Sequence, residues 1–179
     1  MNLLSIPGNS GALYKWLDSF GPVKLISCAE LDSLSKNEIL ILPGGNVSGL
    51  DGILVKKIKE SYQNGCRIFA ICGSSQSLFK KTEEEELECL NIYAGSVVRL
   101  NHPRIGRFDF QSNWFTGKPY FNHSYAVSVN LTYKSDIFIF DSKGFCLAVK
   151  EARIFGVQFH PELSGGVFDK VFSEWIREK

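Results

Sequence analysis

Three residue types that together activate a thiol stand at the ends of two apolar segments of the chain. Cys72 directly follows the apolar run 67–71 and precedes small residues. His160 ends the apolar run 154–159, and Glu162 follows two positions later. A thiol becomes a strong nucleophile when a neighbouring base removes its proton and a third group orients that base. The two segments therefore contain a candidate nucleophile, a candidate base and a candidate orienting carboxylate.

The surroundings of Cys72 are typical of a sharp strand-to-helix turn that exposes a nucleophile. Such a turn needs small neighbours, and Ala70, Gly73 and Ser74 meet this need. A helix is expected over 75–81, and its N-terminus would favour the thiolate. The amide of Gly73 could face a developing oxyanion. A buried core cysteine after a strand is the alternative interpretation.

The spacing of His160 and Glu162 suits a hydrogen bond between them. Residues two apart in extended backbone point the same way, so the carboxylate can fix the imidazole tautomer. A surface turn after a buried strand is the alternative. His123 is a rival base, although no carboxylate follows it at close spacing.

A glycine-rich segment, Pro43-Gly44-Gly45, follows another apolar run at 38–42. Glycines let the backbone approach a ligand closely, and their amides could complete an oxyanion site. An ordinary turn is the alternative interpretation of this segment alone.

Length and composition indicate one globular domain over residues 1–179. The net charge of +1 gives no reason to expect a nucleic acid or an anionic membrane as a partner. The chain contains no apolar stretch long enough to span a bilayer, and its first residues do not resemble a signal peptide. Five cysteines without CxxC spacing argue against a disulfide framework or a zinc site. A cytoplasmic protein is therefore expected.

The first half of the chain alternates strand-like and helix-like segments. Strands are expected at 3–6, 23–27, 38–42 and 67–71, and helices at 12–20, 50–63 and 75–81. This order predicts an α/β fold with a parallel sheet covered on both faces. Ligands in such folds bind beyond the carboxyl ends of the strands, where Gly45 and Cys72 both lie.

The second half predicts an antiparallel extension of the sheet and a final helix. Short strand-like runs occur at 96–100, 125–129, 137–140 and 146–149. The final helix is expected over 168–176, with apolar residues on one face.

In order and spacing, these segments resemble the class I (triad) glutamine amidotransferases, and most closely the HisH glutaminase subunits of imidazole glycerol phosphate synthase. The resemblance covers nearly the whole chain. It is carried by Pro7-Gly8-Asn9, Leu42-Pro43-Gly44-Gly45, Cys72 with Gln76, Ile105-Gly106, Tyr120-Phe121-Asn122-His123-Ser124-Tyr125 and Gln158-Phe159-His160-Pro161-Glu162. It implies a flavodoxin-like, three-layer fold with a mainly parallel central sheet.

The resemblance also implies the chemistry and the role of each residue. Cys72 would attack the side-chain amide of L-glutamine, His160 would move the protons, and Glu162 would orient His160. The oxyanion hole would be formed by the amides of Gly45 and Gly73. The residues implied to hold glutamine are Gln76, Glu84, Ser124 and Tyr125. Ammonia would pass through a tunnel to a synthase subunit, and no metal or organic cofactor is implied.

Several positions depart from the family pattern. Ala70 and Ser74 replace the glycines that usually flank the nucleophile, and Asn46 replaces a glycine of the oxyanion loop. Arg107-Phe108 replaces Trp-Asn near the synthase interface, and Leu163 replaces a lysine. These changes affect the identity of the partner more than the glutaminase chemistry.

Four interpretations remain open. The first is a subunit for histidine biosynthesis with a HisF-like (β/α)₈-barrel partner. The second is a HisH-like glutaminase that supplies ammonia to a sugar amidotransferase acting on a surface polysaccharide. The third is a non-catalytic scaffold that keeps the fold, and the fourth is a cysteine peptidase of a related α/β fold.

Overall fold

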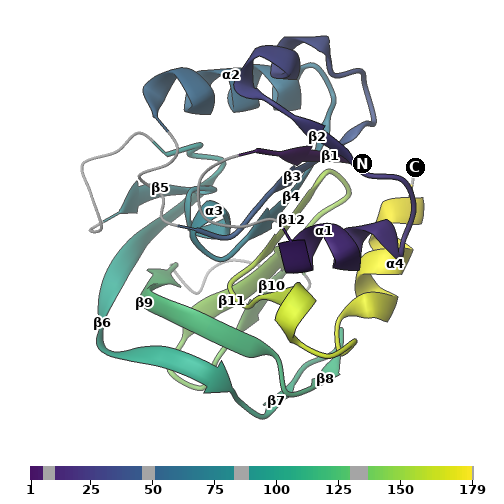
Figure 1. Ribbon diagram of the computed structural model, residues 1–179. Coiled ribbons are helices and arrows are strands. Elements are labelled where there is room, and N and C mark those ends of the chain that lie inside the picture. Colours follow the sequence, from purple (N-terminus) through teal and green to yellow (C-terminus); the bar gives the residue numbers. More distant parts are fainter. Residues whose placement is uncertain (6–10, 46–50, 83–88, 130–136, 179) are drawn as a thin grey trace.

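The computed structural model of the protein describes residues 1–5, 11–45, 51–82, 89–129 and 137–178 (Figure 1). The first half contains β1 (Asn2–Leu4), α1 (Gly11–Asp18), β2 (Lys24–Ile26), η1 (Cys28–Ser33), β3 (Ile39–Leu42), α2 (Gly52–Gln63), β4 (Arg67–Ile71) and α3 (Gly73–Gln76). The second half contains β5 (Phe79–Thr82), β6 (Tyr93–Arg107), β7 (Phe110–Gln111), β8 (Thr116–Gly117), β9 (Tyr120–Ser128), β10 (Phe138–Phe140), β11 (Phe145–Lys150), β12 (Ile154–Val157), η3 (Pro161–Leu163) and α4 (Asp169–Arg177).

One mixed sheet of the described residues organises the fold. Its strands follow the order β2-β1-β3-β4-β12-β11-β9-β6-β5, and β10 pairs with β11 beside this path. The strands from β2 to β12 are parallel. The pairs β12–β11, β11–β9 and β9–β6 are antiparallel, and β5 pairs parallel with β6 at the edge. The expected α/β fold, with a parallel part and an antiparallel extension, is confirmed.

Strand β4 shows how the sequence builds two cores from one sheet. Successive side chains of a strand point to opposite faces. Ile68 and Ala70 lie in the core that includes α2, whereas Phe69 and Ile71 lie in the core that includes α1 and α4. Figure 1 shows α2 above the parallel strands, and α1 and α4 together on the other side. Because both faces are covered, the central strand is apolar at nearly every position.

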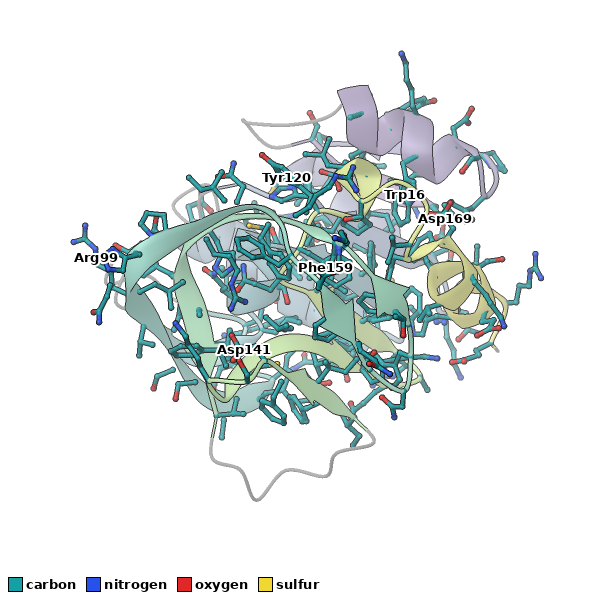
Figure 2. All side chains as sticks on the ribbon, turned by 90° about the horizontal axis from the view of Figure 1, so that it is seen from below. Trp16, Arg99, Tyr120, Asp141, Phe159 and Asp169 are labelled. Carbon is teal, nitrogen blue, oxygen red and sulfur yellow. The ribbon has the colours of Figure 1, made fainter. Side chains whose placement is uncertain are left out.

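The core under α1 and α4 is aromatic. Phe69 contacts the rings of Phe155 and Phe172 at centroid distances of 5.7 and 4.6 Å. The indole Nε1 of Trp16 donates to Asp169 Oδ1 at 2.8 Å, which ties α1 to α4 (Figure 2). Helices α1 and α4 are thereby held to each other and to the sheet.

Buried Arg67 joins the first residue of β4 to the last turn of α4. Its guanidinium donates to the carbonyl oxygens of Trp175, Ile176 and Glu178, and it lies 4.2 Å from the Trp175 ring centroid. The last carbonyls of a helix have no partner within the helix, so a cation placed there satisfies them and opposes the helix dipole.

The helix expected over 75–81 is wrong beyond its first turn. Helix α3 covers only Gly73–Gln76, and the chain enters β5 at Phe79. The carbonyl of Leu78 accepts the amides of Ile92 and Tyr93, and the Phe79 and Tyr93 rings lie 5.7 Å apart. Pairing with a distant strand therefore outweighs the local preference for helix.

Strands β6 and β9 are longer than their apolar runs predict. Their pairing extends from Ser96 opposite Ser128 to Arg107 opposite Tyr120. The pairing shifts register between Arg99 and Arg104 and resumes over 104–107, where β6 has no buried apolar residue to signal a strand. No helix within the described ranges is long and apolar enough to cross a membrane.

Candidate active site

Cys72 occupies a strained turn between β4 and α3. Its φ of 51° and ψ of −116° are unusual for a residue with a side chain, and such a conformation costs about 1–3 kcal/mol. The Cys72 amide donates to Val157 O at 2.7 Å, and its carbonyl accepts the Gln76 amide at 3.1 Å. The sheet and the first helical turn therefore hold the backbone in this conformation. The geometry is that of a nucleophile elbow.

The neighbours of the turn accommodate Ala70, one of the two residues that replace glycine around Cys72. Ala70 is fully buried in β4, opposite Leu42 on one side and Gly156 on the other. A Cβ at Gly156 would lie 2.7 Å from both Ser75 Oγ and Leu78 Cδ1. The close packing of Ser75 and Leu78 against β12 therefore favours glycine at position 156, whereas position 70 in β4 holds a methyl group.

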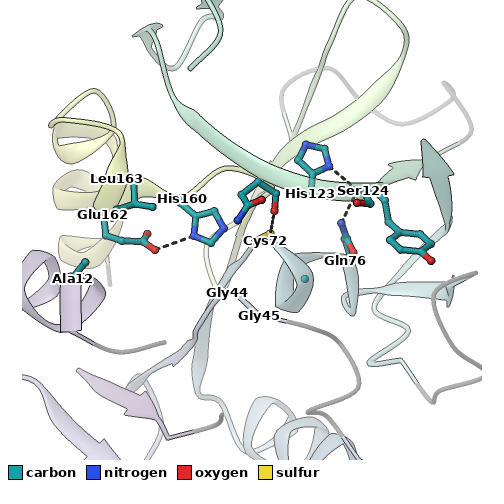
Figure 3. Close-up of a pocket in the computed structure, with 13 residues that line it drawn as sticks. Ala12, Gly44, Gly45, Cys72, Gln76, His123, Ser124, His160, Glu162 and Leu163 are labelled. Carbon is teal, nitrogen blue, oxygen red and sulfur yellow. Dashed lines mark hydrogen bonds and ion pairs between the residues drawn. The ribbon is translucent and has the colours of Figure 1, made fainter. Parts of the chain in front are cut away.

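His160 and Glu162 lie at the start of η3, three residues beyond the end of β12. The His160 amide donates to Tyr120 O at 2.8 Å, which anchors the segment to β9. His160 Nδ1 lies 2.9 Å from Glu162 Oε1, as the dashed line in Figure 3 marks. The Glu162 side chain is only 1% exposed. A buried carboxylate on Nδ1 directs Nε2 away from Glu162.

The ring of His160 also contacts Cys72. Burial by itself lowers the pKa of His160, but hydrogen bonds with Cys72 and Glu162 outweigh burial and raise this pKa to about 10. The imidazole therefore holds a proton at neutral pH, beside Cys72. Figure 3 shows the His160 ring between the Glu162 carboxylate and the position of Cys72.

Two further groups approach the sulfur of Cys72. Gln158 Nε2 lies 3.8 Å from it, and the Asn122 carbonyl oxygen lies 3.7 Å from it. Gln158 is 2% exposed and accepts a hydrogen bond from Gln76 Nε2 at 2.9 Å. The sequence reasoning assigned neither residue a role. A signal existed for Gln158, because it is the polar residue two positions before His160 in an apolar segment.

A cavity of about 490 Å³ opens in front of this cluster. The structure places these sequence-predicted residues along its wall: Gly45, Cys72, Gly73, Gln76, Ser124, Tyr125, His160 and Glu162. Gly45 has a φ of 153°, a conformation that favours glycine. Glu84 lies outside the described residues.

His123 does not take the position of the base. Its Nδ1 lies 2.7 Å from Tyr125 O, so this nitrogen carries the hydrogen. Burial, the largest influence, lowers the pKa of His123 to about 4. The ring is therefore neutral at pH 7, and in Figure 3 His160 rather than His123 lies beside Cys72.

The arrangement can perform covalent catalysis at a carbonyl carbon. It combines a thiol at a strained turn that lines the cavity, a protonated imidazole and a buried carboxylate. Within the described ranges, no group of three or more His, Cys, Asp or Glu side chains could hold a metal ion.

The sequence as a whole identifies the family. The family described as "Glutamine amidotransferase class-I" matches residues 19–176, which is most of the chain. The chain therefore belongs to the class I glutamine amidotransferases, enzymes that hydrolyse glutamine, and the resemblance found in the sequence is confirmed.

Individual members of the family and one solved structure are similar to the chain over most of its length. The imidazole glycerol phosphate synthase subunit HisH of Thermotoga maritima is 25% identical over an alignment of 186 positions that covers 95% of this chain and 92% of that protein. The HisH subunit of Dehalococcoides mccartyi is 32% identical over an alignment of 163 positions that covers 78% of each chain. A crystal structure of a glutamine amidotransferase has a TM-score of 0.73 over 98% of this chain and 97% of that one. Its identity is 17%, so it supports the fold alone.

Proposed function

We propose that this protein is the glutaminase subunit of a two-component glutamine amidotransferase. It hydrolyses L-glutamine to glutamate and ammonia through a thioester on Cys72, and it passes the ammonia to a synthase subunit. The observation that carries the proposal is the contact of Cys72, in its strained turn, with a protonated His160 that is fixed by buried Glu162.

The proposed reaction begins with the Cys72 thiolate, which attacks the carboxamide carbon of glutamine. The carbonyl oxygen becomes an oxyanion, and the amides of Gly45 and Gly73 donate to it. His160 then gives its proton to the departing amine, which leaves as ammonia, and the thioester remains. Water attacks the thioester with His160 as general base, and glutamate is released. Glu162 keeps the imidazole in one orientation through both steps.

The substrate is proposed to lie along Gln76, Ser124 and Tyr125, with Glu84 at a position outside the described residues. Gln76 Nε2 already donates to Tyr125 O at 2.8 Å and to Gln158 Oε1 at 2.9 Å. Both of its hydrogens are therefore used. The remaining acceptor, Gln76 Oε1, suits the α-ammonium group of glutamine.

An exposed apolar rim supports the need for a partner. The rim is formed by Ile105, Phe108 and Leu163, which are 62%, 42% and 41% exposed. Leu163 lines the cavity, and Ile105 pairs with Asn122, another cavity residue. A partner seated on this rim would keep ammonia from bulk water, where it would be protonated. Apolar surface beside a reaction site is typical of a docking face.

Two acceptors for the ammonia are supported by different observations. The names of the relatives favour imidazole glycerol phosphate synthase, with a HisF-like (β/α)₈ barrel and a place in histidine biosynthesis. The replacement of the usual rim residues by Arg107, Phe108 and Leu163 favours a HisH-like glutaminase that serves a sugar amidotransferase. A pull-down from the native source, followed by identification of the retained protein, separates these two possibilities.

The glutaminase chemistry is tested with a glutamine-mimicking electrophile. We expect one adduct on Cys72 in the mass spectrum, blocked by excess glutamine and absent from Cys72→Ser. The Cys72→Ala variant should lose at least about a thousandfold in glutamine-dependent turnover, while the partner still accepts free ammonia. An unmodified Cys72 in the presence of the retained partner would refute the proposal and favour a scaffold role.

A further inference from the structure

Ser74 links the nucleophile turn to the segment that is proposed to bind the oxyanion. Its hydroxyl donates to the carbonyl oxygen of Pro43 at 2.7 Å, and the residue is only 3% exposed. Ser74 lies two residues after Cys72, whereas Pro43 immediately precedes Gly44 and Gly45. The hydrogen bond therefore joins two parts of the cavity wall that come from different strand ends.

This hydrogen bond restricts the peptide between Pro43 and Gly44. A trans peptide is planar, and its N–H points opposite to its C=O. A fixed Pro43 carbonyl therefore also fixes the direction of the Gly44 amide, from which the chain continues into Gly45. Without the hydroxyl, this peptide could rotate about the ψ of Pro43 and the φ of Gly44, and glycine restricts φ little.

The restricted peptide lies directly against the reacting groups. A Cβ built on Gly44 would be 2.7 Å from His160 Cε1 and 3.4 Å from Cys72 Cβ. Little space separates this backbone from the proposed base and nucleophile, so a rotation here would change the shape of the site itself.

We propose that Ser74 is a positioning residue that fixes the Pro43–Gly44 peptide and holds the segment Gly44–Gly45 ready to receive the oxyanion before a partner binds. The inference rests on the proposed glutaminase function. The class usually has glycine at this position, which lacks a hydroxyl, so the restriction is a property of this chain. Its isolated subunit should accordingly keep basal turnover that depends on Ser74.

The activity test compares Ser74→Ala and Ser74→Gly with Ser74→Thr, which keeps the hydroxyl. Removal of the hydroxyl should lower kcat about tenfold, less than the loss of an oxyanion donor itself, and leave KM within about twofold. Alkylation of Cys72 by iodoacetamide, read from the Cys72 peptide by mass spectrometry, should stay unchanged because it needs the thiolate and no oxyanion. Ser74→Thr should restore kcat at least partly.

Ser77→Ala is the matched control. Ser77 is fully buried in the same turn, and its hydroxyl donates to Ser74 O at 2.7 Å, whereas the hydroxyl that donates to Pro43 O is that of Ser74. Its kcat should match that of the wild type. A Ser74→Ala kcat within twofold of wild type would overturn the inference, and so would a parallel fall in the rate of Cys72 alkylation. The latter result would place the role of Ser74 in the nucleophile turn.

A measurement that needs no activity separates this inference from the proposed function. The chain has only two Pro-Gly pairs, Pro7-Gly8 and Pro43-Gly44. Labelling with [1-¹³C]proline and [¹⁵N]glycine therefore selects two amide signals by NMR. Ser74→Ala should shift or broaden the Gly44 signal and leave the Gly8 signal unchanged. An unaltered Gly44 signal in folded Ser74→Ala refutes the inference whether or not the wild type hydrolyses glutamine.

Discussion

Gly44→Ala tests how closely the backbone packs against the proposed base. The added Cβ would lie 2.7 Å from His160 Cε1 and 3.3 Å from His160 Nδ1. Because Nδ1 is held by Glu162 at 2.9 Å, the ring cannot rotate away without losing that hydrogen bond. Moving the imidazole back to ordinary contact at 3.4 Å requires a shift of about 0.7 Å.

A shift of this size should affect catalysis strongly. A misplacement of about 1 Å costs about a hundredfold in rate, so 0.7 Å corresponds to about thirtyfold in kcat. This factor equals about 2 kcal/mol of transition-state stabilisation. Cys72 alkylation at neutral pH should fall as well, because the displaced imidazole no longer holds the thiolate. This result differs from the one expected for Ser74→Ala.

The assay is steady-state glutaminase activity, with the partner added where the isolated subunit is slow. Gly11→Ala is the control, because a Cβ there meets no atom within 4 Å. Circular dichroism and thermal melting should show that both variants are folded. A Gly44→Ala kcat within threefold of wild type would refute the packing argument.

Two predictions concern stability. Burial lowers the pKa of His123 from 6.5 to about 4. Between these two pH values the unfolded chain is protonated at His123 and the folded chain is not. The contribution of neutral His123 to stability is therefore fully present above pH 6.5 and is lost as the pH falls towards 4. From pH 7 to 5, urea unfolding should lose about 2 kcal/mol in the wild type beyond the loss in His123→Asn, and equal losses would contradict this reasoning. Arg67→Met should lower the free energy of unfolding by about 2 kcal/mol, because carbonyls at the end of α4 lose their donor. Exposed Arg177→Met is the control, and an equal effect of the two substitutions would show that Arg67 does not cap the helix.

Local sequence was sufficient to predict an element where one apolar run corresponds to one strand or helix. The run 67–71 predicts β4 to the residue, since both faces of a central strand are buried and every position after Arg67 is apolar. The final helix was also expected within one residue, because α4 buries one face through Val171, Phe172 and Trp175. The segments around Cys72 and His160 were found for a similar reason, because each directly follows such a run.

The local pattern was not sufficient where long-range pairing decides the structure. Residues 79–81 were expected to continue a helix and instead lie in β5, because the chain there pairs with β6. The strand β9 begins at Tyr120, five residues before its expected start, because its first residues pair with 104–107 of β6. Periodicity in one segment contains no information about the segment that pairs with it.

By itself, the sequence determined which groups could react: a thiol after one strand, an imidazole and a carboxylate after another, and glycines after a third. Only the tertiary structure decided that His160 rather than His123 lies beside Cys72, that Gln158 approaches the sulfur, and that Ser74 holds Pro43. The physical reason is that these contacts join residues about 30 to 90 positions apart. The register of β4 against β3 and β12 fixes them, and no short segment specifies that register.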